Sequence, residues 1–231
     1  MRLLLVGHGK MGRLVEALAP DSGFEVAGVL DSASPGHGRG ADADVWNGVE
    51  VAVDFSTPQA VPHNAATLAR RGINLVIGTT GWQHEEAAIR AAVASSGVGA
   101  VVAPNFSTGV VLFEAIVARA AALFAPQADF GAFVTEAHHA AKKDAPSGTA
   151  LLLKRAMEQA GFARLIDLSS IRAGFIPGTH TVGFDGPAET VTLTHAARDR
   201  SSFARGALAA ARWVVGRRGW FTMRDVLGLN S

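Results

Sequence analysis

The chain has 231 residues, 48% of them hydrophobic and 18% charged, and a formal net charge of +1. This composition excludes an intrinsically disordered chain, because disorder goes with low hydrophobicity and high net charge. Since 21 basic side chains nearly balance 20 acidic ones, we expect neither nucleic acid nor a membrane surface as a partner. Cysteine is absent, which excludes disulfides, thiolate metal sites and a cysteine nucleophile.

No targeting segment is apparent. The N-terminal apolar run, Leu3-Leu4-Leu5-Val6, is shorter than the ~7–15 residues of a signal peptide. No window reaches the ~18 uninterrupted apolar residues of a membrane span. We therefore expect a cytoplasmic protein, and the length allows one or two domains.

Apolar runs and helix-like stretches alternate over the first hundred residues. The runs at 3–6, 25–30, 49–55, 74–77 and 98–103 predict strands, and the stretches at 11–18, 59–70 and 85–94 predict helices. The strand runs are continuous, as expected when both faces of a sheet are covered. Strand–helix–strand repetition predicts a Rossmann-like, doubly wound α/β sheet of parallel strands in a domain over residues 1–108.

The segment between Asp31 and Asn47 interrupts this alternation. It contains three glycines and a proline, which disfavour a full crossover helix. We expect a mobile loop here, with one short helical turn.

The pattern changes after residue 108. Helices are predicted at 110–124 and 147–159, and strands at 130–137, 166–173, 180–184 and 190–194, with a hairpin turn at Asp185-Gly186-Pro187. Strands grouped in this way predict a second, α+β domain over residues 109–199, with a mixed or antiparallel sheet and helices on one face. A last helix is predicted at 203–215 and a short turn at 223–227, within a C-terminal segment of residues 200–231.

The first predicted strand runs directly into Gly7-His8-Gly9-Lys10-Met11-Gly12, a G-x-G-x-x-G motif that opens the first helix. Its glycines permit a tight turn, a close approach of a pyrophosphate and tight packing of helix on strand. Asp31 ends the second strand 19 residues after Gly12, where an acid that meets the ribose hydroxyls is expected. The motif therefore predicts a dinucleotide site, with a plain structural turn as the alternative.

Asp31 also bears on the choice of cofactor. Ser32-Ala33-Ser34 follows it, without an adjacent arginine to hold a 2′-phosphate, so we expect NADH to be preferred. Lys10 or Arg39 would soften that preference, and NADPH remains an alternative.

Two later strands end in small polar turns, Gly78-Thr79-Thr80-Gly81 and Ala103-Pro104-Asn105-Phe106. Ligands of open α/β sheets bind outside the carboxyl ends of the strands, so these turns are expected to line a nicotinamide pocket. Each turn by itself is also what an ordinary strand-to-helix connection looks like.

The densest group of reactive side chains lies at residues 136–150. It holds His138, His139, Lys142 and Lys143, followed by a Pro-Ser-Gly-Thr turn that begins a helix. Imidazoles, amines and helix N-terminal amides suit proton donation to an anionic substrate, with its carboxylates held by Lys142 and the amides of residues 147–149.

Three other interpretations of this segment stay open. The adjacent histidines could be zinc ligands, but no third ligand lies at ordinary spacing, so we predict no metal site. The two lysines could be a solvated charge pair. Ser147 or Thr149 could serve only as a helix cap.

The segment at 136–150 is similar to the signature of the 4-hydroxy-tetrahydrodipicolinate reductase (dihydrodipicolinate reductase) family. The pattern E-x-H-H-x-x-K-x-D-A-P-S-G-T-A is matched at every fixed position. The resemblance extends over residues 7–13, 53–56, 78–81, 103–109, 172–180, 194–213 and 223–230, and fails mainly at 32–48.

This resemblance implies NAD(P)H-dependent reduction of 4-hydroxy-tetrahydrodipicolinate, a small cyclic dicarboxylate, to tetrahydrodipicolinate in lysine and diaminopimelate biosynthesis. It further implies that residues 109–199 bind substrate and assemble a homotetramer, and that residues 200–231 return to the first domain.

The resemblance also implies roles for single residues. His138 matches the proton donor, and Lys142 matches a second acid–base or substrate-binding lysine. His139, Gly148 and Thr149 match substrate-binding positions. Ser147 is predicted to bind substrate with them, because it lies at the start of the predicted helix. The positions that match cofactor contacts are Gly7, His8, Gly9, Lys10, Met11, Gly12, Asp31, Gly78, Thr79, Thr80, Ala103, Pro104, Asn105 and Phe106.

The segment after Asp31 departs from the family pattern. It is shorter than in many relatives, which affects the adenosine-side contacts and so the cofactor preference.

Two rival functions are also considered. The first rival is another two-domain NAD(P)-dependent dehydrogenase, of which the cysteine-dependent acylating kind is excluded. The second is a regulator that senses NADH without chemistry.

Overall fold

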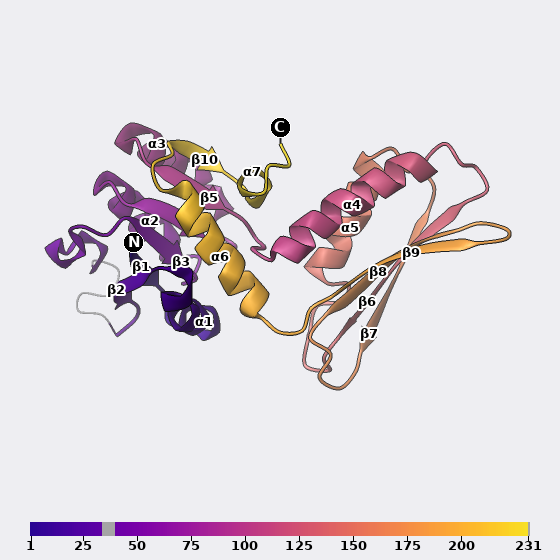
Figure 1. Ribbon diagram of the computed structural model, residues 1–231, viewed down its shortest axis with the longest axis horizontal. Helices are drawn as coiled ribbons and strands as arrows, with labels where there is room; N and C mark the ends of the chain where they lie inside the picture. Colours follow the sequence, from indigo (N-terminus) through magenta and orange to yellow (C-terminus); the bar gives the residue numbers. More distant parts are fainter. Residues whose placement is uncertain (34–39, 231) are drawn as a thin grey trace. The chain divides into compact units, whose positions relative to one another are not determined.

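The computed structural model describes residues 1–33 and 40–230 and divides into two compact units. The first unit comprises Met1–Thr108 and Ser201–Ser231, and the second comprises Gly109–Arg200. Figure 1 shows a sheet with its own helices in each unit. No helix among the described residues has the length and apolar character needed to cross a membrane.

The first unit is built on a six-stranded sheet with the order β10-β5-β4-β3-β1-β2. Its strands are β1 (Arg2–Val6), β2 (Glu25–Leu30), β3 (Val51–Asp54), β4 (Asn74–Ile77), β5 (Gly99–Val102) and β10 (Gly219–Phe221). All the pairs are parallel, and the strand order reverses between β1 and β3. Ligands bind at such a reversal in open α/β sheets.

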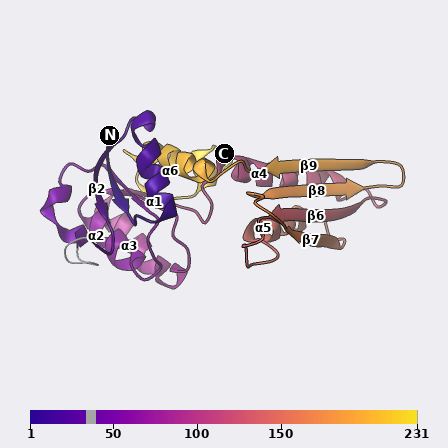
Figure 2. The same ribbon diagram turned by 90° about the horizontal axis from the view of Figure 1, so that it is seen from below.

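Helices cover both faces of this sheet (Figure 2). They are α1 (Lys10–Leu18), α2 (Val61–Arg70), α3 (Glu86–Ser96), α6 (Ser201–Val214) and the short α7 (Met223–Val226). Helices α1 and α6 contact each other, as do α2 and α3. Because both faces are covered, the strands are buried on both sides, which explains their continuous apolar runs.

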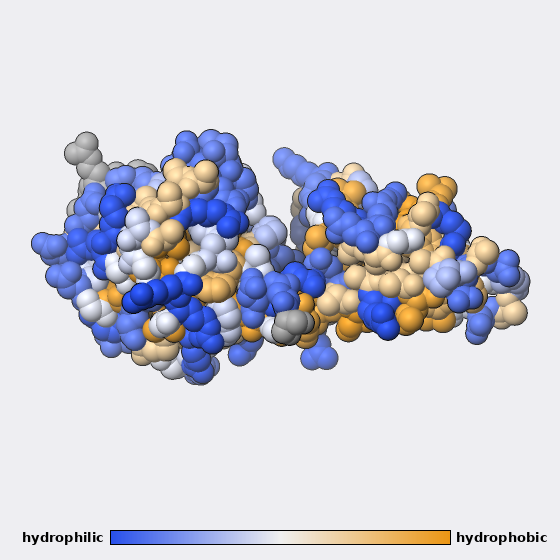
Figure 3. All heavy atoms as spheres, turned by 90° about the horizontal axis from the view of Figure 1, so that it is seen from above, coloured by the Kyte–Doolittle hydropathy of each residue, from blue (hydrophilic) through white to orange (hydrophobic). Residues whose placement is uncertain are grey.

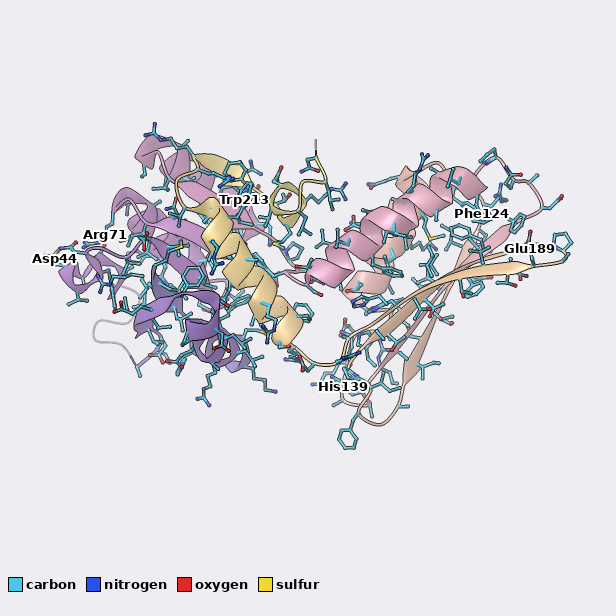
Figure 4. All side chains as sticks on the ribbon, in the orientation of Figure 1. Asp44, Arg71, Phe124, His139, Glu189 and Trp213 are labelled. Carbon is cyan, nitrogen blue, oxygen red and sulfur yellow. The ribbon has the colours of Figure 1, made fainter. Side chains whose placement is uncertain are left out.

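The described part of the segment between β2 and β3 is more ordered than expected. It forms two 3₁₀ turns, Gly40–Asp42 and Asp44–Trp46, where one turn was predicted. The Arg71 guanidinium ties the segment to α2, because it donates to the Asp42 carbonyl at 3.0 Å and pairs with Asp44 at 3.3 Å (Figure 4). Residues 34–39, which include Arg39, lie outside the described residues.

The second unit has a four-stranded mixed sheet with the order β7-β6-β8-β9. Its elements are α4 (Thr108–Phe124), β6 (Gly131–His138), α5 (Gly148–Gln159), β7 (Ile166–Arg172), β8 (Thr179–Asp185) and β9 (Thr190–Ala196). Strand β7 is parallel to β6, while β6–β8 and β8–β9 are antiparallel. Both helices lie on one face of the sheet (Figure 1).

A separate core holds the second unit together. It packs α4 and α5 onto the sheet through Phe113, Leu153, Met157, Val182 and Phe184. The predicted fold class, a doubly wound parallel sheet with a second α+β domain of mixed sheet, is confirmed. Strand β10 was missed, because three residues are too few to show a periodicity.

Candidate active site

The glycine-rich turn after β1 has the close contacts expected of a phosphate-binding loop. Gly7 has φ +91°, and a Cβ there would lie 2.5 Å from the Phe55 carbonyl oxygen. A Cβ on Gly12 would lie 2.1 Å from the Gly7 oxygen, so α1 packs directly on the turn. Among the described residues, no atom beyond its own chain neighbours lies within 4 Å of the Cβ position of Gly9, the N-cap of α1. The space before Gly9 is therefore open to a ligand.

A cavity of about 450 Å³ lies beside this turn, at the point where the strand order reverses. The residues that line it follow the carboxyl ends of β1, β2 and β3 or begin the helices after them. They are Val6, Gly7, His8, Gly9, Arg13, Leu30, Asp31, Ser32, Phe55, Ser56, Thr57, Ala60 and Asn64. Four predicted cofactor residues, Gly7, His8, Gly9 and Asp31, are among them, whereas Lys10, Met11 and Gly12 are not.

The lining of this cavity fits a dinucleotide. Asp31 stands at the end of β2, and its Oδ1 accepts the Ala33 amide at 2.9 Å. Asn64 is 4% exposed, and its Oδ1 has no hydrogen-bond partner among the described residues. A buried acceptor without a partner is costly, which points to a donor on a bound molecule. Sequence reasoning missed Asn64 and Arg13, because single polar residues on α2 and α1 form no motif.

The turns after β3, β4 and β5 meet at the same edge of the sheet. The Phe55 ring packs on Gly78, whose Cβ would lie 2.1 Å from it, and makes an edge contact with Phe106 at 6.0 Å between centroids. On α6, a Cβ at Gly206 would lie 1.7 Å from the Phe106 carbonyl oxygen. The segments 78–80 and 103–106 are therefore neighbours, but neither segment is part of the lining of the cavity described above.

A buried carboxylate organises these turns. Asp54, at the end of β3, accepts hydrogen bonds from Thr79 Oγ1 at 2.8 Å and from Ser56 Oγ at 2.7 Å. Burial raises the pKa of Asp54, against the opposing effect of these hydrogen bonds. The Thr79 side chain thus serves to hold the turn after β4 against β3. Asp54 was missed, because one acid at a strand end carries no signal of its own.

In the second unit, the reactive side chains gather around Glu136, which is 1% exposed. Arg172 donates to both carboxylate oxygens, from Nη2 to Oε1 at 2.6 Å and from Nη1 to Oε2 at 3.0 Å. His138 Nδ1 hydrogen-bonds to Oε2, and the Ser147 amide donates to Oε1 at 3.2 Å. Burial alone would raise the pKa of Glu136, but the hydrogen bonds that it accepts, that of Arg172 first, lower it to about 2.

A second histidine completes this cluster. His180 on β8 lies opposite Glu136 in the strand register, and its ring centroid is 5.1 Å from that of His138. Burial lowers the pKa of His180 to about 4, so its ring is neutral near pH 7. Its Nε2 hydrogen-bonds with Ser147 Oγ at 3.1 Å.

The N-terminus of α5 is attached to the sheet by these contacts. Ser147 is the N-cap, and its Oγ accepts the Ala150 amide at 3.2 Å. Gly148 begins the helix with open space at its Cβ position, and Thr149 is half-buried. The capping role left open for Ser147 is thus present, together with its contacts to Glu136 and His180.

The remaining predicted residues surround this cluster. Lys142 Nζ donates to both carboxylate oxygens of Asp144, at 2.7 and 2.8 Å. The Asp144 carbonyl in turn accepts Arg172 Nη2 at 2.6 Å. His139 is half-buried just beyond the end of β6 (Figure 4). Strand alternation places it on the opposite face from His138.

The same cluster offers a potential metal-binding geometry. Ligand atoms of Glu136, His138 and His180 lie within 4.8 Å of one another. However, the guanidinium of Arg172 already engages both oxygens of Glu136, and a cation would have to displace it. The cluster is therefore better suited to hydrogen bonding than to metal coordination.

Comparisons with known proteins cover both units. Residues 1–106 match the family model for dihydrodipicolinate reductase, N-terminus, and residues 109–227 match that for dihydrodipicolinate reductase, C-terminus. A 4-hydroxy-tetrahydrodipicolinate reductase of Rhodopseudomonas palustris (strain TIE-1) is 38% identical, over 100% of this chain and 98% of the relative. One from Methanoregula boonei is also 38% identical, over 96% of each chain.

A solved structure shares the fold. The dipicolinate-bound dihydrodipicolinate reductase from Paenisporosarcina sp. TG-14 superposes with a TM-score of 0.83, over 97% of this chain and 98% of the other. The two sequences are 23% identical.

Proposed function

Because the chain belongs to the dihydrodipicolinate reductase family, we propose that it reduces 4-hydroxy-tetrahydrodipicolinate to tetrahydrodipicolinate, with His138 as the proton donor. The family matches confirm the resemblance predicted from residues 136–150, and the protein is an NAD(P)H-dependent oxidoreductase of lysine biosynthesis. The observation that carries the proposed chemistry is the pairing of His138 with the buried, ionised Glu136 beside the N-terminus of α5.

The first unit is proposed to hold the cofactor. When bound, the reduced nicotinamide supplies a hydride to a ring carbon of the substrate. The open space before Gly9 accommodates the pyrophosphate, and the amides that begin α1 face it. The turns at 78–80 and 103–106 are proposed to line the nicotinamide end.

Two charged side chains of the cavity bear on the choice of cofactor. The Asp31 carboxylate can accept both ribose hydroxyls and would repel a 2′-phosphate. Arg13 lines the same cavity and would attract that phosphate. We infer that NADH is preferred and that Arg13 allows NADPH as a weaker cofactor.

The second unit is proposed to hold the substrate. The first-turn amides of Gly148 and Thr149 have no acceptor within α5, so they can bind a substrate carboxylate. Lys142, now paired with Asp144, can exchange that partner for a second substrate carboxylate. His139 directly follows β6 and is proposed, from the family resemblance, to contribute a further contact to the substrate.

The decisive test is turnover. Protein, NADH and enzymatically generated 4-hydroxy-tetrahydrodipicolinate are mixed, and the absorbance of the reduced nicotinamide is followed. We expect the absorbance to fall, and His138→Gln to lower kcat by about 10²–10⁴-fold, the usual contribution of a positioned acid. NADH affinity should be unchanged, because His138 lies in the second unit.

Other results would refute parts of the proposal. A flat trace with NADH binding intact would favour a sensor, and oxidation of NADH only with other substrates would indicate a different dehydrogenase. An undiminished kcat in His138→Gln would remove this residue as the proton donor.

We further propose a homotetramer assembled through the second unit. The face of its sheet opposite α4 and α5 leaves Ile171 54% exposed, and Phe175, in the loop after β7, is 97% exposed. Leu112, Ile116 and Leu123 are exposed on α4, and Figure 3 shows hydrophobic residues gathered over this unit. Apolar patches of this kind mark protein–protein contacts. Light scattering at four times the mass of one chain would support the proposal, and a monomer would refute it.

A further inference from the structure

The carboxylate of Glu136 is hydrogen-bonded to Nδ1 of His138. We infer that Glu136 is the positioning residue of His138: it keeps the Nδ1 proton in place and thereby reserves Nε2 for the substrate. This inference rests on the proposed function, which makes His138 the proton donor. Nothing in the sequence motif distinguishes Glu136 from a plain ion-pair partner of Arg172.

Glu136 is ionised. Its pKa of about 2 leaves it ionised at any working pH, and an ionised carboxylate can only accept hydrogen bonds. His138 Nδ1 contacts Oε2 of this carboxylate, so Nδ1 must carry a proton. Neutral His138 is then the Nδ1–H tautomer, with an unprotonated Nε2.

The protonation of Nδ1 determines in which form His138 can donate a proton from Nε2. With Nδ1–H held by Glu136, only the doubly protonated ring carries a proton on Nε2. In carboxylate–imidazole pairs of other enzymes the acid likewise fixes the orientation and tautomer of the ring. The proton donor is therefore the imidazolium, and Glu136 supplies its counter-charge.

The surroundings of Nε2 include a glycine. Gly178, at φ +149°, passes beside this atom, and a Cβ on Gly178 would lie only 3.1 Å from it. The His138 side chain is 12% exposed. The absence of a side chain at Gly178 therefore leaves room at Nε2 that any other residue would reduce.

The other charged or titratable groups near the ring fit this assignment. Arg172 comes from β7 and is neutralised by Glu136 and Asp144. Burial lowers the pKa of both His180 on β8 and His195 on β9, so neither adds a positive charge near pH 7. Lys142 is paired with Asp144 in the loop after β6. Glu136 is thus the anion in direct contact with His138.

The geometry predicts what Glu136→Gln does. A glutamine has one acceptor oxygen. Arg172 Nη1 donates at the Oε2 position, whereas both Arg172 Nη2 and the Ser147 amide donate at the Oε1 position. The glutamine oxygen is therefore held there, and its NH₂ group takes the Oε2 position that faces His138 Nδ1. An NH₂ donor at this place reverses the tautomer, so the neutral ring becomes Nε2–H.

The test reads the tautomer directly. Long-range ¹H–¹⁵N correlation spectra of [¹⁵N]histidine-labelled protein distinguish Nδ1–H from Nε2–H rings. The chain has eight histidines, and the signal of His138 is the one lost in His138→Gln. We expect Nδ1–H in the wild type and Nε2–H in Glu136→Gln, with kcat lowered by at least about 10²-fold and the KM for NADH unchanged.

Glu189→Gln is the matched control. It makes the same chemical change in the same unit, but Glu189 lies in the β8–β9 hairpin, at the opposite end of the sheet from His139 (Figure 4). Its tautomer pattern and kcat should equal those of the wild type.

Two results would overturn the inference: an Nε2–H ring in the wild type, or a Glu136→Gln protein that keeps both the tautomer and kcat. If Glu136→Gln does not fold, the wild-type spectrum alone decides. The spectrum does not depend on turnover, so a wild type with the Nδ1–H pattern and no reductase activity would support the positioning of the ring and refute the proposed reaction.

Discussion

Acid should destabilise the second unit through Glu136, because this residue is both buried and ionised. Its pKa lies near 2 in the folded state, against 4.5 for an unperturbed glutamate. A carboxyl group with a lowered folded pKa stabilises the fold above its unfolded pKa and loses that contribution as the pH falls toward the folded value. The sensitive window therefore runs from about pH 4.5 down to about pH 2.

The magnitude follows from the size of the shift. One pKa unit corresponds to about 1.4 kcal/mol, so the full contribution of Glu136 at neutral pH is roughly 3 kcal/mol. Between pH 6 and pH 3, about 2 kcal/mol of it should be lost. Solvent screens the interactions of the Glu136 carboxylate little, because the residue is 1% exposed.

The assay compares the free energy of unfolding in urea at pH 6 and pH 3, for the wild type and Glu136→Gln. All four tryptophans, Trp46, Trp82, Trp213 and Trp220, lie in the first unit, so their fluorescence follows that unit alone. Far-ultraviolet circular dichroism adds the second unit. The wild type should lose about 2 kcal/mol more than the variant between the two pH values, because other titrating groups are common to both proteins.

An equal loss in both proteins would refute this reasoning. It would mean that the pKa of Glu136 is the same in the folded and unfolded chains. The hydrogen bonds with Arg172 would then lower this pKa only as much as burial raises it. A larger loss seen only by tryptophan fluorescence would place the acid-sensitive group in the first unit, also against the prediction.

Two further predictions concern the first unit. Asp31→Ser should raise the ratio of kcat/KM for NADPH to kcat/KM for NADH by about tenfold or more. The substitution removes a charge that repels the 2′-phosphate, while Arg13 remains to attract it. An unchanged ratio in steady-state assays with both cofactors would contradict this prediction. Gly206→Ala should destabilise this unit by about 1–3 kcal/mol, measured by tryptophan fluorescence in urea, because its Cβ would lie 1.7 Å from the Phe106 carbonyl oxygen. Arg205→Ala, on the exposed side of α6, is its control, and equal stability of the two variants would disprove the close packing.

The sequence predicted the architecture well, because each unit is built from elements with a clear period. Continuous apolar runs and amphipathic stretches identified the parallel sheet and its helices, since burial on both faces leaves a direct mark on composition. Strand β10 and the 3₁₀ turns at Gly40–Asp42 and Asp44–Trp46 show no periodic pattern of apolar residues. They are short, and tertiary contacts such as those of Arg71 stabilise them.

The candidate sites divide in the same way. The glycine-rich loop and the His-His-Lys segment are contiguous motifs, and their local chemistry can be interpreted from residue types and spacing alone. The family matches then confirmed the resemblance that these motifs carry.

The environment of these motifs was decided by the tertiary structure. Glu136 meets Arg172, 36 residues away, because β7 pairs with β6 in parallel, and it meets His180 because β8 pairs with β6 in the antiparallel direction. Likewise Phe55 contacts the turns after β4 and β5, and Asn64 of α2 lines the cavity beside the glycine-rich turn. The sequence by itself determined which reactive groups the chain carries and the class of fold that presents them. Strand register and burial decided which partners those groups have, and hence their protonation, because both depend on residues far apart in the chain.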